Sequence, residues 1–196
     1  MTSVSAITIA VIGSGTDEHA ALAAPVGRLL AQLGVNLLTG GGGGVMTSVS
    51  RAFVETPREA GVCIGIIPCR SESERARPKE GYPNRFVELP IYTHLPHSGA
   101  RGREDLSRNH INVLSPAAIV ALPGEEGTAS EVSLALDYHK PVIAYAPDAG
   151  LIAHFAAGVE RTSDLSRVRA FLGSFCDAAQ KSSVGASWRP GRKAGG

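Results

Sequence analysis

The sequence of residues 35–55 is VNLLTGGGGGVMTSVSRAFVE, and this stretch decides the fold class. The apolar residues 35–38 predict a short buried strand, and residues 45 to about 55 carry apolar side chains at helical spacing. Five consecutive glycines, residues 40–44, join the two. A strand that passes through a glycine-rich turn into a helix is typical of parallel sheets with crossover helices. The stretch therefore predicts an α/β protein.

The same alternation of strand and helix continues on both sides of this stretch. Further strands are predicted at 7–12, 62–67, 86–92, 117–122 and 142–145, and helices near 18–33, 104–114, 128–139 and 165–179. We expect a single Rossmann-like domain at residues 1–181, with a doubly wound parallel sheet and helices on both faces. Residues 182–196 are small, polar and basic, and a disordered tail is predicted there.

Composition and charge narrow the possible functions. The chain has 196 residues, of which 43% are hydrophobic, and its formal net charge is +1. This balance argues against disorder and against a dedicated binder of nucleic acid or of anionic membranes. Three cysteines without a C-x-x-C pair suggest reduced thiols, and no apolar run is long enough for a membrane helix. We therefore expect a soluble cytoplasmic protein with a small-molecule ligand.

Three glycine-rich loops should form the ligand site. In open α/β sheets, the loops after the carboxyl ends of the strands meet in one crevice. Glycine lets backbone N–H groups approach an anion, and the start of the following helix adds partial positive charge. We therefore expect a phosphate-bearing ligand, although the first loop is explained equally well as a tight turn. The predicted binding residues are Gly13, Ser14, Gly15, Gly41, Gly42, Gly43, Gly44, Met46, Asn109, Pro123, Gly124, Gly127 and Thr128.

Other cofactor chemistries fit the sequence poorly. A P-loop needs a lysine after its last glycine, but Val45 stands there and the first lysine of the chain is Lys79. The first turn lacks the G-x-G-x-x-G pattern of dinucleotide binding. None of the lysines lies in the predicted loops, which argues against a pyridoxal phosphate enzyme. His94 and His97 have no matching third ligand, so no metal site is expected. No cofactor beyond the ligand itself is required.

A longer pattern supports a family resemblance. Arg108-Asn109 is followed by PGEEGTASE at residues 123–131, and GGGGGVM stands at residues 40–46. Together these motifs resemble the Lonely Guy (LOG) family, whose signature is P-G-G-x-G-T-x-x-E preceded by an arginine and whose members were once called lysine decarboxylases. The resemblance covers about residues 5–147.

The resemblance implies an activity and its residues. LOG enzymes are phosphoribohydrolases that release the base from a nucleoside 5'-monophosphate, typically as dimers, so Arg108 and Glu131 would be catalytic and the chain a homodimer. Two positions depart from the family pattern, because Glu125 replaces the second motif glycine and Asn109 replaces the usual lysine. The Arg-Asn form is more similar to a LOG-like branch that includes molybdenum-cofactor carrier proteins. A non-catalytic carrier of a nucleotide or of molybdopterin is therefore the alternative, and a scaffold without ligand is a third.

Chemistry allows two roles for each charged residue of the motif. A carboxylate at Glu131 could stabilise positive charge on a ribose, but Thr128 and Glu131 also have the spacing of a capping box, which the residues alone favour. Arg108 could hold a phosphate or pair with Glu104 four residues earlier. Glu125 would repel a phosphate, so we expect it to point outward to solvent. Turned inward, it would favour a less anionic ligand.

Overall fold

The computed structural model describes residues 7–185, with side chains described to residue 177. Within this range, seven parallel strands form one sheet in the order β4-β3-β2-β1-β5-β6-β7. The strands are β1 (Thr8–Ile12), β2 (Asn36–Thr39), β3 (Cys63–Ile67), β4 (Leu89–Tyr92), β5 (Ala118–Ala121), β6 (Val142–Tyr145) and β7 (Glu160–Thr162). The helices are α1 (Ala20–Gln32), α2 (Val45–Glu55), α3 (Asn109–Leu114), α4 (Glu126–Asp137) and α5 (Leu165–Gly185), with short 3-10 turns η1 (Gly99–Arg101) and η2 (Ala149–Ile152).

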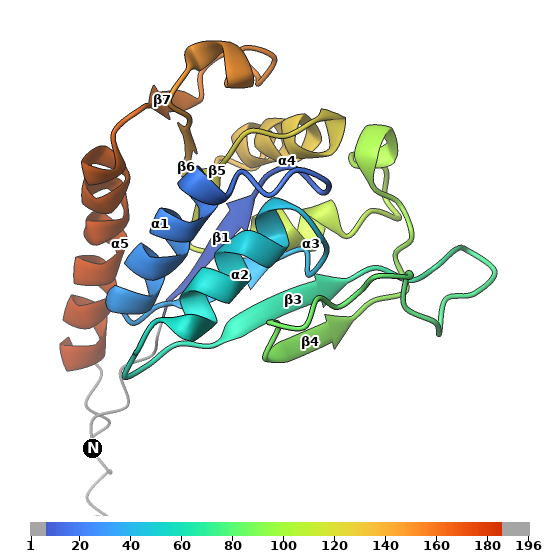
Figure 1. The fold of residues 1–196 in the computed structure, drawn as a ribbon, viewed down its shortest axis with the longest axis horizontal. Coiled ribbons are helices and arrows are strands. Elements are labelled where there is room, and N and C mark those ends of the chain that lie inside the picture. The colour runs from blue at the N-terminus through green and yellow to red at the C-terminus, as the bar shows by residue number, and fades with distance from the viewer. Residues whose placement is uncertain (1–6, 186–196) are drawn as a thin grey trace, which may run out of the picture.

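Helices cover both faces of the sheet (Figure 1). Alternate residues of a strand point to opposite faces, so β1 contributes Ile9 and Val11 to the apolar core beneath α1, α2 and α5. Ala10 and Ile12 belong to the second core, beneath α3 and α4. A strand that is apolar on both faces is typical of parallel sheets. The predicted α/β class and the doubly wound sheet are therefore confirmed.

Several predicted boundaries differ from the structure. Strand β7 was not predicted, because it has only three residues and two of them, Glu160 and Arg161, are exposed and charged. The helix predicted at 104–114 begins only at Asn109, and the helix predicted at 128–139 begins two residues earlier, at Glu126. Helix α5 runs to Gly185. The rest of the predicted tail, residues 186–196, lies outside the described residues.

The strand order sets the place of a ligand site. Strand β1 pairs with β2 on one side and with β5 on the other. The chain therefore adds β2 to β4 on one side of β1 and β5 to β7 on the other side, so the strand order reverses at β1. Ligands of open α/β sheets bind outside the carboxyl ends of the strands at such a reversal. The loops that follow β1, β2 and β5 are the three glycine-rich loops of the sequence. No helix within residues 7–185 combines the length and the apolar character that a bilayer span needs.

Helices α1 and α2 pack unusually close to each other at Gly27. A Cβ atom at this position would lie 2.5 Å from the carbonyl oxygen of Val49 and 3.0 Å from the Cβ of Ala52. Real Cβ atoms do not approach a backbone oxygen so closely, so any side chain at residue 27 would push the two helices apart. This contact positions α2 and the glycine-rich loop that precedes it.

We predict that Gly27→Ala lowers the free energy of unfolding by about 1–3 kcal/mol, the usual cost of overpacking. Gly173→Ala is the matched control, because outside the adjoining backbone of α5 no atom of the described residues lies within 4 Å of the Cβ position at Gly173. There the same change should stabilise the protein by about 0.5–1 kcal/mol, since alanine favours the helix more than glycine does. Urea denaturation measures both values, and equal stabilities of Gly27→Ala and the unsubstituted protein would contradict the packing argument.

Candidate functional site

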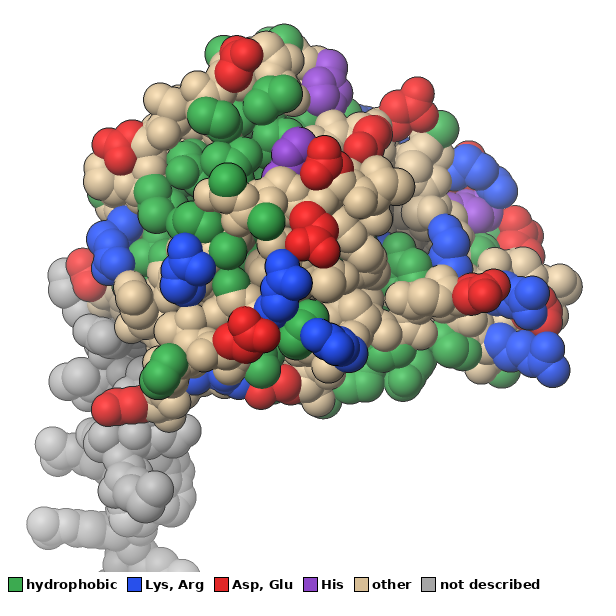
Figure 2. Space-filling view, in the orientation of Figure 1, with side chains coloured by type: hydrophobic (Ala, Val, Ile, Leu, Met, Phe, Trp, Pro, Cys, Tyr) green, Lys and Arg blue, Asp and Glu red, His purple; other side chains and the backbone are tan. Residues whose placement is uncertain are grey.

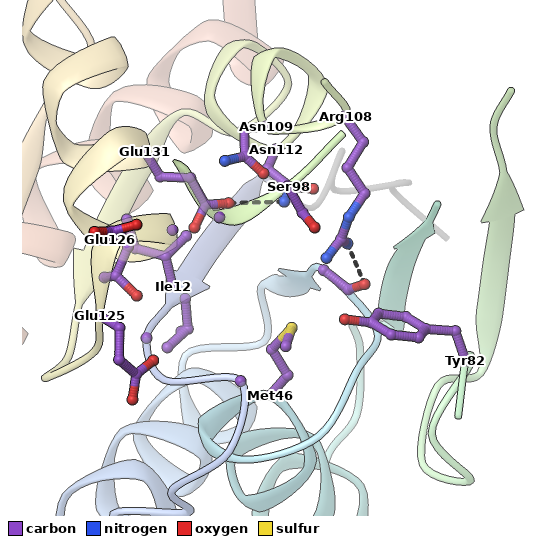
Figure 3. A pocket seen from close by; sticks show the side chains of 17 residues that line it. Ile12, Met46, Tyr82, Ser98, Arg108, Asn109, Asn112, Glu125, Glu126 and Glu131 are labelled. Atoms are coloured by element: carbon purple, nitrogen blue, oxygen red, sulfur yellow. Dashed lines mark hydrogen bonds between the residues drawn. The ribbon is translucent and has the colours of Figure 1, made fainter. Parts of the chain in front are cut away.

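A cavity of about 520 Å³ opens at the carboxyl ends of the strands, where the sheet reverses direction (Figure 3). It is lined by Val11, Ile12, Gly13, Gly15, Gly40, Met46, Tyr82, Ser98, Gly99, Arg108, Asn109, Asn112, Glu125, Glu126, Gly127, Thr128 and Glu131. These residues come from the loops after β1, β2 and β5, from α3 and α4, and from two long loops that flank β4. Its size is in the range of sites for small organic ligands.

The predicted site residues divide into two groups. Both predicted catalytic residues, Arg108 and Glu131, line the cavity. The predicted binding residues that line it are Gly13, Gly15, Met46, Asn109, Gly127 and Thr128. The predicted binding residues that do not line it are Ser14, Gly41, Gly42, Gly43, Gly44, Pro123 and Gly124.

The glycines of the second group pack against other parts of the chain. A Cβ at Gly44, where φ is +59°, would overlap the carbonyl oxygen of Ser14. A Cβ at Gly42 would lie 2.6 Å from atoms of the Tyr82 ring, and one at Gly124 would overlap the side chain of Thr128. These glycines therefore bring the three loops into contact with one another and with the loop that carries Tyr82.

Many backbone donors of these loops are already used. The N–H of Ser14 donates to the carbonyl of Pro123 at 2.9 Å, and the N–H of Val45 donates to the carbonyl of Ser14 at 2.9 Å. The N–H of Gly41 donates to Oγ1 of Thr39 at 3.1 Å. The first turn of α4 is different, because its N–H groups have no acceptor within the helix and no side chain caps them. That turn lines the cavity, and it is the better place for an anionic group.

Arg108 is a buried cation that joins two strand ends. Only 5% of the residue is exposed, and its Nη1 donates to the carbonyl of Gly40, after β2, and at 2.5 Å to that of Ile66, in β3. The guanidinium carbon lies 5.3 Å from the ring centroid of Tyr82. Burial lowers the pKa of Arg108. The predicted pair with Glu104 is wrong, because Glu104 bonds instead to another arginine of the same exposed loop.

Glu131 lies on the opposite wall and is also buried, with 9% of the residue exposed. Its Oε1 accepts a hydrogen bond of 2.8 Å from Nδ2 of Asn112. Burial raises the pKa of Glu131, while this hydrogen bond and the charge of Arg108 act in the other direction. The predicted capping box is wrong, because α4 begins at Glu126 and Thr128 already lies inside its first turn. The carboxyl of Glu131 is therefore turned into the site, where it forms no ion pair with Arg108.

Glu125 lies at the edge of the cavity. The residue is exposed, but its Oε1 accepts hydrogen bonds from Oγ of Ser14 at 2.7 Å and from Oγ1 of Thr16 at 3.5 Å. The side chain thus turns back onto the first glycine loop and borders the cavity, so the expectation that it points outward to solvent is wrong. Together with Glu126 and Glu131 it places three carboxylates around the cavity, against the single guanidinium of Arg108.

Among the lining residues that were not predicted, Asn112 and Tyr82 matter most for the argument. Asn112 lies one helical turn after Arg108, so the spacing of four residues on α3 was a signal that could have found it. Tyr82 lies in the polar segment 69–84, between β3 and β4. Nothing in the local pattern indicates that this loop returns its one aromatic ring to the site.

The histidines of the loop after β4 do not line the cavity. His97 is buried, and its Nε2 lies 3.0 Å from Oε1 of Glu72. Within residues 7–185, no group of three or more His, Cys, Asp or Glu side chains is placed to hold a metal ion.

Comparisons with known proteins give one matching family model and several similar proteins. The family model named SLOG cluster4 family matches residues 6–169. An uncharacterized protein of Archaeoglobus fulgidus is 31% identical over 141 residues, which are 71% of this chain and 80% of that protein. The structure of the molybdenum cofactor binding protein from Rippkaea orientalis is similar with a TM-score of 0.67 at 30% identity, over 88% of this chain and 99% of that one. The molybdenum cofactor carrier protein of Chlamydomonas reinhardtii gives a TM-score of 0.61 at 29% identity, over the same shares.

The raised pKa of Glu131 leads to a prediction about stability. Because the folded protein holds this proton more tightly than the unfolded chain, the free energy of unfolding falls as the pH rises above about 4.5, the ordinary value. Glu131→Gln removes this decrease in the free energy of unfolding, because glutamine has no proton to lose. Relative to the unsubstituted protein, the variant should therefore gain up to about 1.4 kcal/mol for each pH unit until the raised pKa is passed.

Urea denaturation at pH 4.5 and pH 8 measures this difference. Glu59→Gln, at an exposed position outside the cavity, is the control and should change stability by less than about 0.5 kcal/mol at both pH values. A stability difference for Glu131→Gln that is the same at both pH values would show that the carboxyl titrates normally.

Proposed function

The chain belongs to the SLOG cluster4 family, and we propose that it binds a phosphorylated heterocyclic small molecule in this cavity and carries it without cleaving it. The observation on which this proposal depends is the state of Arg108. Its guanidinium donates to Gly40 and Ile66 and packs beside Tyr82, and it forms no ion pair with Glu131. Arg108 is therefore engaged in holding two backbone carbonyls and is not paired with Glu131, the residue with which cleavage would use it.

The cavity suits such a cargo in size and in the distribution of its polar groups. A volume of about 520 Å³ is large enough for a two-ring heterocycle and a phosphate. The uncapped first turn of α4 provides backbone donors and partial positive charge for the phosphate. The molybdenum cofactor is a phosphorylated pterin, and two proteins of similar structure are named as its binding and carrier proteins. These points support a pterin-type or purine-type cargo.

A nucleoside 5'-monophosphate phosphoribohydrolase is the second candidate. It is favoured by one observation, namely that Arg108 and Glu131, the residues that the LOG resemblance implies to be catalytic, line the same cavity. In that reaction the carboxylate of Glu131 would stabilise the positive charge that develops on the ribose when the N-glycosidic bond breaks. Because burial raises the pKa of Glu131, this role requires that the bound ligand favour the charged form of the carboxyl.

We further propose the homodimer that the LOG resemblance implies. Strand β4 is an edge of the sheet, and Leu89 and Ile91 on it are exposed by 47% and 44%. Leu114, at the end of α3, is exposed by 49%. Figure 2 shows hydrophobic side chains along the lower rim of the molecule, where Figure 1 places β4. An exposed apolar edge strand is a hazard for aggregation, and a second copy would cover it.

Turnover and binding can be separated in one experiment. The purified protein is incubated with AMP, N6-prenylated AMP, GMP and dihydroneopterin monophosphate, and free base, ribose 5-phosphate and the midpoint of thermal unfolding are measured. A carrier should gain about 2.7 kcal/mol of stability from a ligand at 100 times its Kd, and no base should be released. Base release that disappears in Glu131→Ala would instead establish the hydrolase. If none of the four compounds raises the unfolding midpoint, the protein is a scaffold without this ligand.

The dimer proposal predicts the effect of a charge on the edge strand. Light scattering should give about twice the mass of one chain for the unsubstituted protein, and Ile91→Lys should give the mass of one chain, because a buried unpaired ammonium is costly. Glu160→Lys, at an exposed position on β7, the opposite edge of the sheet, should remain dimeric. A monomeric unsubstituted protein, or a dimer in all three cases, would show that β4 is not the interface.

A further inference from the structure

Carboxylates outnumber cationic side chains around the cavity. Three carboxylates, Glu125, Glu126 and Glu131, border it. The one cationic side chain, Arg108, already donates to two backbone carbonyls. A ligand that fits this environment must therefore bring donors to the wall that Glu131 forms, away from its phosphate.

Glu131 and Asn112 form the acceptor-rich wall (Figure 3). Asn112 donates to Oε1 of Glu131, but Oε2 accepts no hydrogen bond from any residue in the described part of the chain. Asn112 is 2% exposed, and its Oδ1 is a buried acceptor without a donor within residues 7–185. Oδ1 of Asn112 has no surface that a ligand could reach, so Oε2 of Glu131 is the open acceptor of this wall, and a ligand that brings donors to it would complete the site.

We propose that Glu131 reads the 2-amino-4-oxopyrimidine edge that guanine and pterin share, through the two oxygens of its carboxylate. This inference rests on the proposed function, because it identifies the heterocycle of the same ligand. The edge presents a ring N–H beside an exocyclic N–H with parallel directions, and a carboxylate accepts such a pair of donors side by side. A carboxylate has about four acceptor positions, so the hydrogen bond from Asn112 leaves room for both.

Other purines match this wall less well. Hypoxanthine has the ring N–H but lacks the exocyclic amino group, so it offers one donor in place of two. Adenine presents its amino group beside a ring nitrogen that is itself an acceptor, which repels the second carboxylate oxygen. The proposal therefore predicts a rank of affinity, with guanine first, hypoxanthine second and adenine third.

Asn112 acts as a positioning residue in this scheme. Its amide is held on α3, and its hydrogen bond of 2.8 Å fixes the orientation of the Glu131 carboxylate on the neighbouring helix α4. Burial raises the pKa of this carboxyl, and the bond from Asn112 acts in the opposite direction by favouring the charged form, which is the form that accepts two donors. Asn112 does not need to touch the ligand for this role.

Calorimetric titration of GMP, IMP and AMP tests the proposal on the unsubstituted protein. GMP and IMP differ only in the 2-amino group, so GMP should bind at least about tenfold more tightly than IMP, as expected for one hydrogen bond to a charged acceptor. In Glu131→Gln the ratio of the two Kd values should fall to about one, because an amide offers a single acceptor oxygen. Glu59→Gln should keep the ratio of the unsubstituted protein.

The outcomes of this titration distinguish failure of the proposed contact between Glu131 and the 2-amino-4-oxopyrimidine edge from failure of the proposed function. AMP that binds as tightly as GMP overturns the assignment and leaves the carrier proposal standing, whereas failure of all ligands overturns the carrier proposal itself. A GMP preference that persists in Glu131→Gln shows that another residue reads the edge. Dihydroneopterin monophosphate identifies the source of the shared edge, since tighter binding than GMP indicates a pterin cargo and weaker binding indicates a guanine nucleotide.

Discussion

The guanidinium of Arg108 holds the site together by donating to the carbonyl that follows β2 and to one at the end of β3. Gly40 directly follows β2, and Ile66 lies one residue before the end of β3. A buried backbone oxygen without a donor is costly, so the arginine completes the hydrogen bonding of the sheet at this edge. Gly40 is required there, because a Cβ would overlap the guanidinium. The floor of the cavity thus depends on one side chain from α3.

The position of Arg108 changes what its motif can do. An arginine that is free to move can follow a phosphate through a reaction, whereas one bonded to two carbonyls is fixed before a ligand arrives. The departure from the LOG signature at residue 125 also favours binding over cleavage. Glu125 replaces a glycine and bonds to Ser14, so negative charge replaces open backbone at the edge of the cavity. The polar side chains around the resulting site are held in place before a ligand arrives. Such a site favours selective binding of a ligand over the side-chain movements that a reaction would need.

Much of the fold was predictable from sequence, because apolar runs closed by glycine identify buried parallel strands. The motif likewise predicted that Arg108 and Glu131 belong to one site, and both line the same cavity. Sequence reasoning failed where two local patterns look alike. The spacing of Thr128 and Glu131 is that of a capping box, but the helix begins two residues before Thr128, since extended Glu125 precedes it and its carbonyl accepts the N–H of Ala129. Tyr82 was missed for another reason, because only tertiary folding returns its loop to the site.

The contact between Gly42 and the ring of Tyr82 links two distant parts of the chain. Because no Cβ fits between them, the ring can stand beside Arg108 only while residue 42 is glycine. Residues 42 and 82 are thus constrained to change as a pair, and a chain of this family with a larger residue at the first position should lack an aromatic ring at the second. The volume of the cavity can therefore diverge among relatives through a glycine that does not line it.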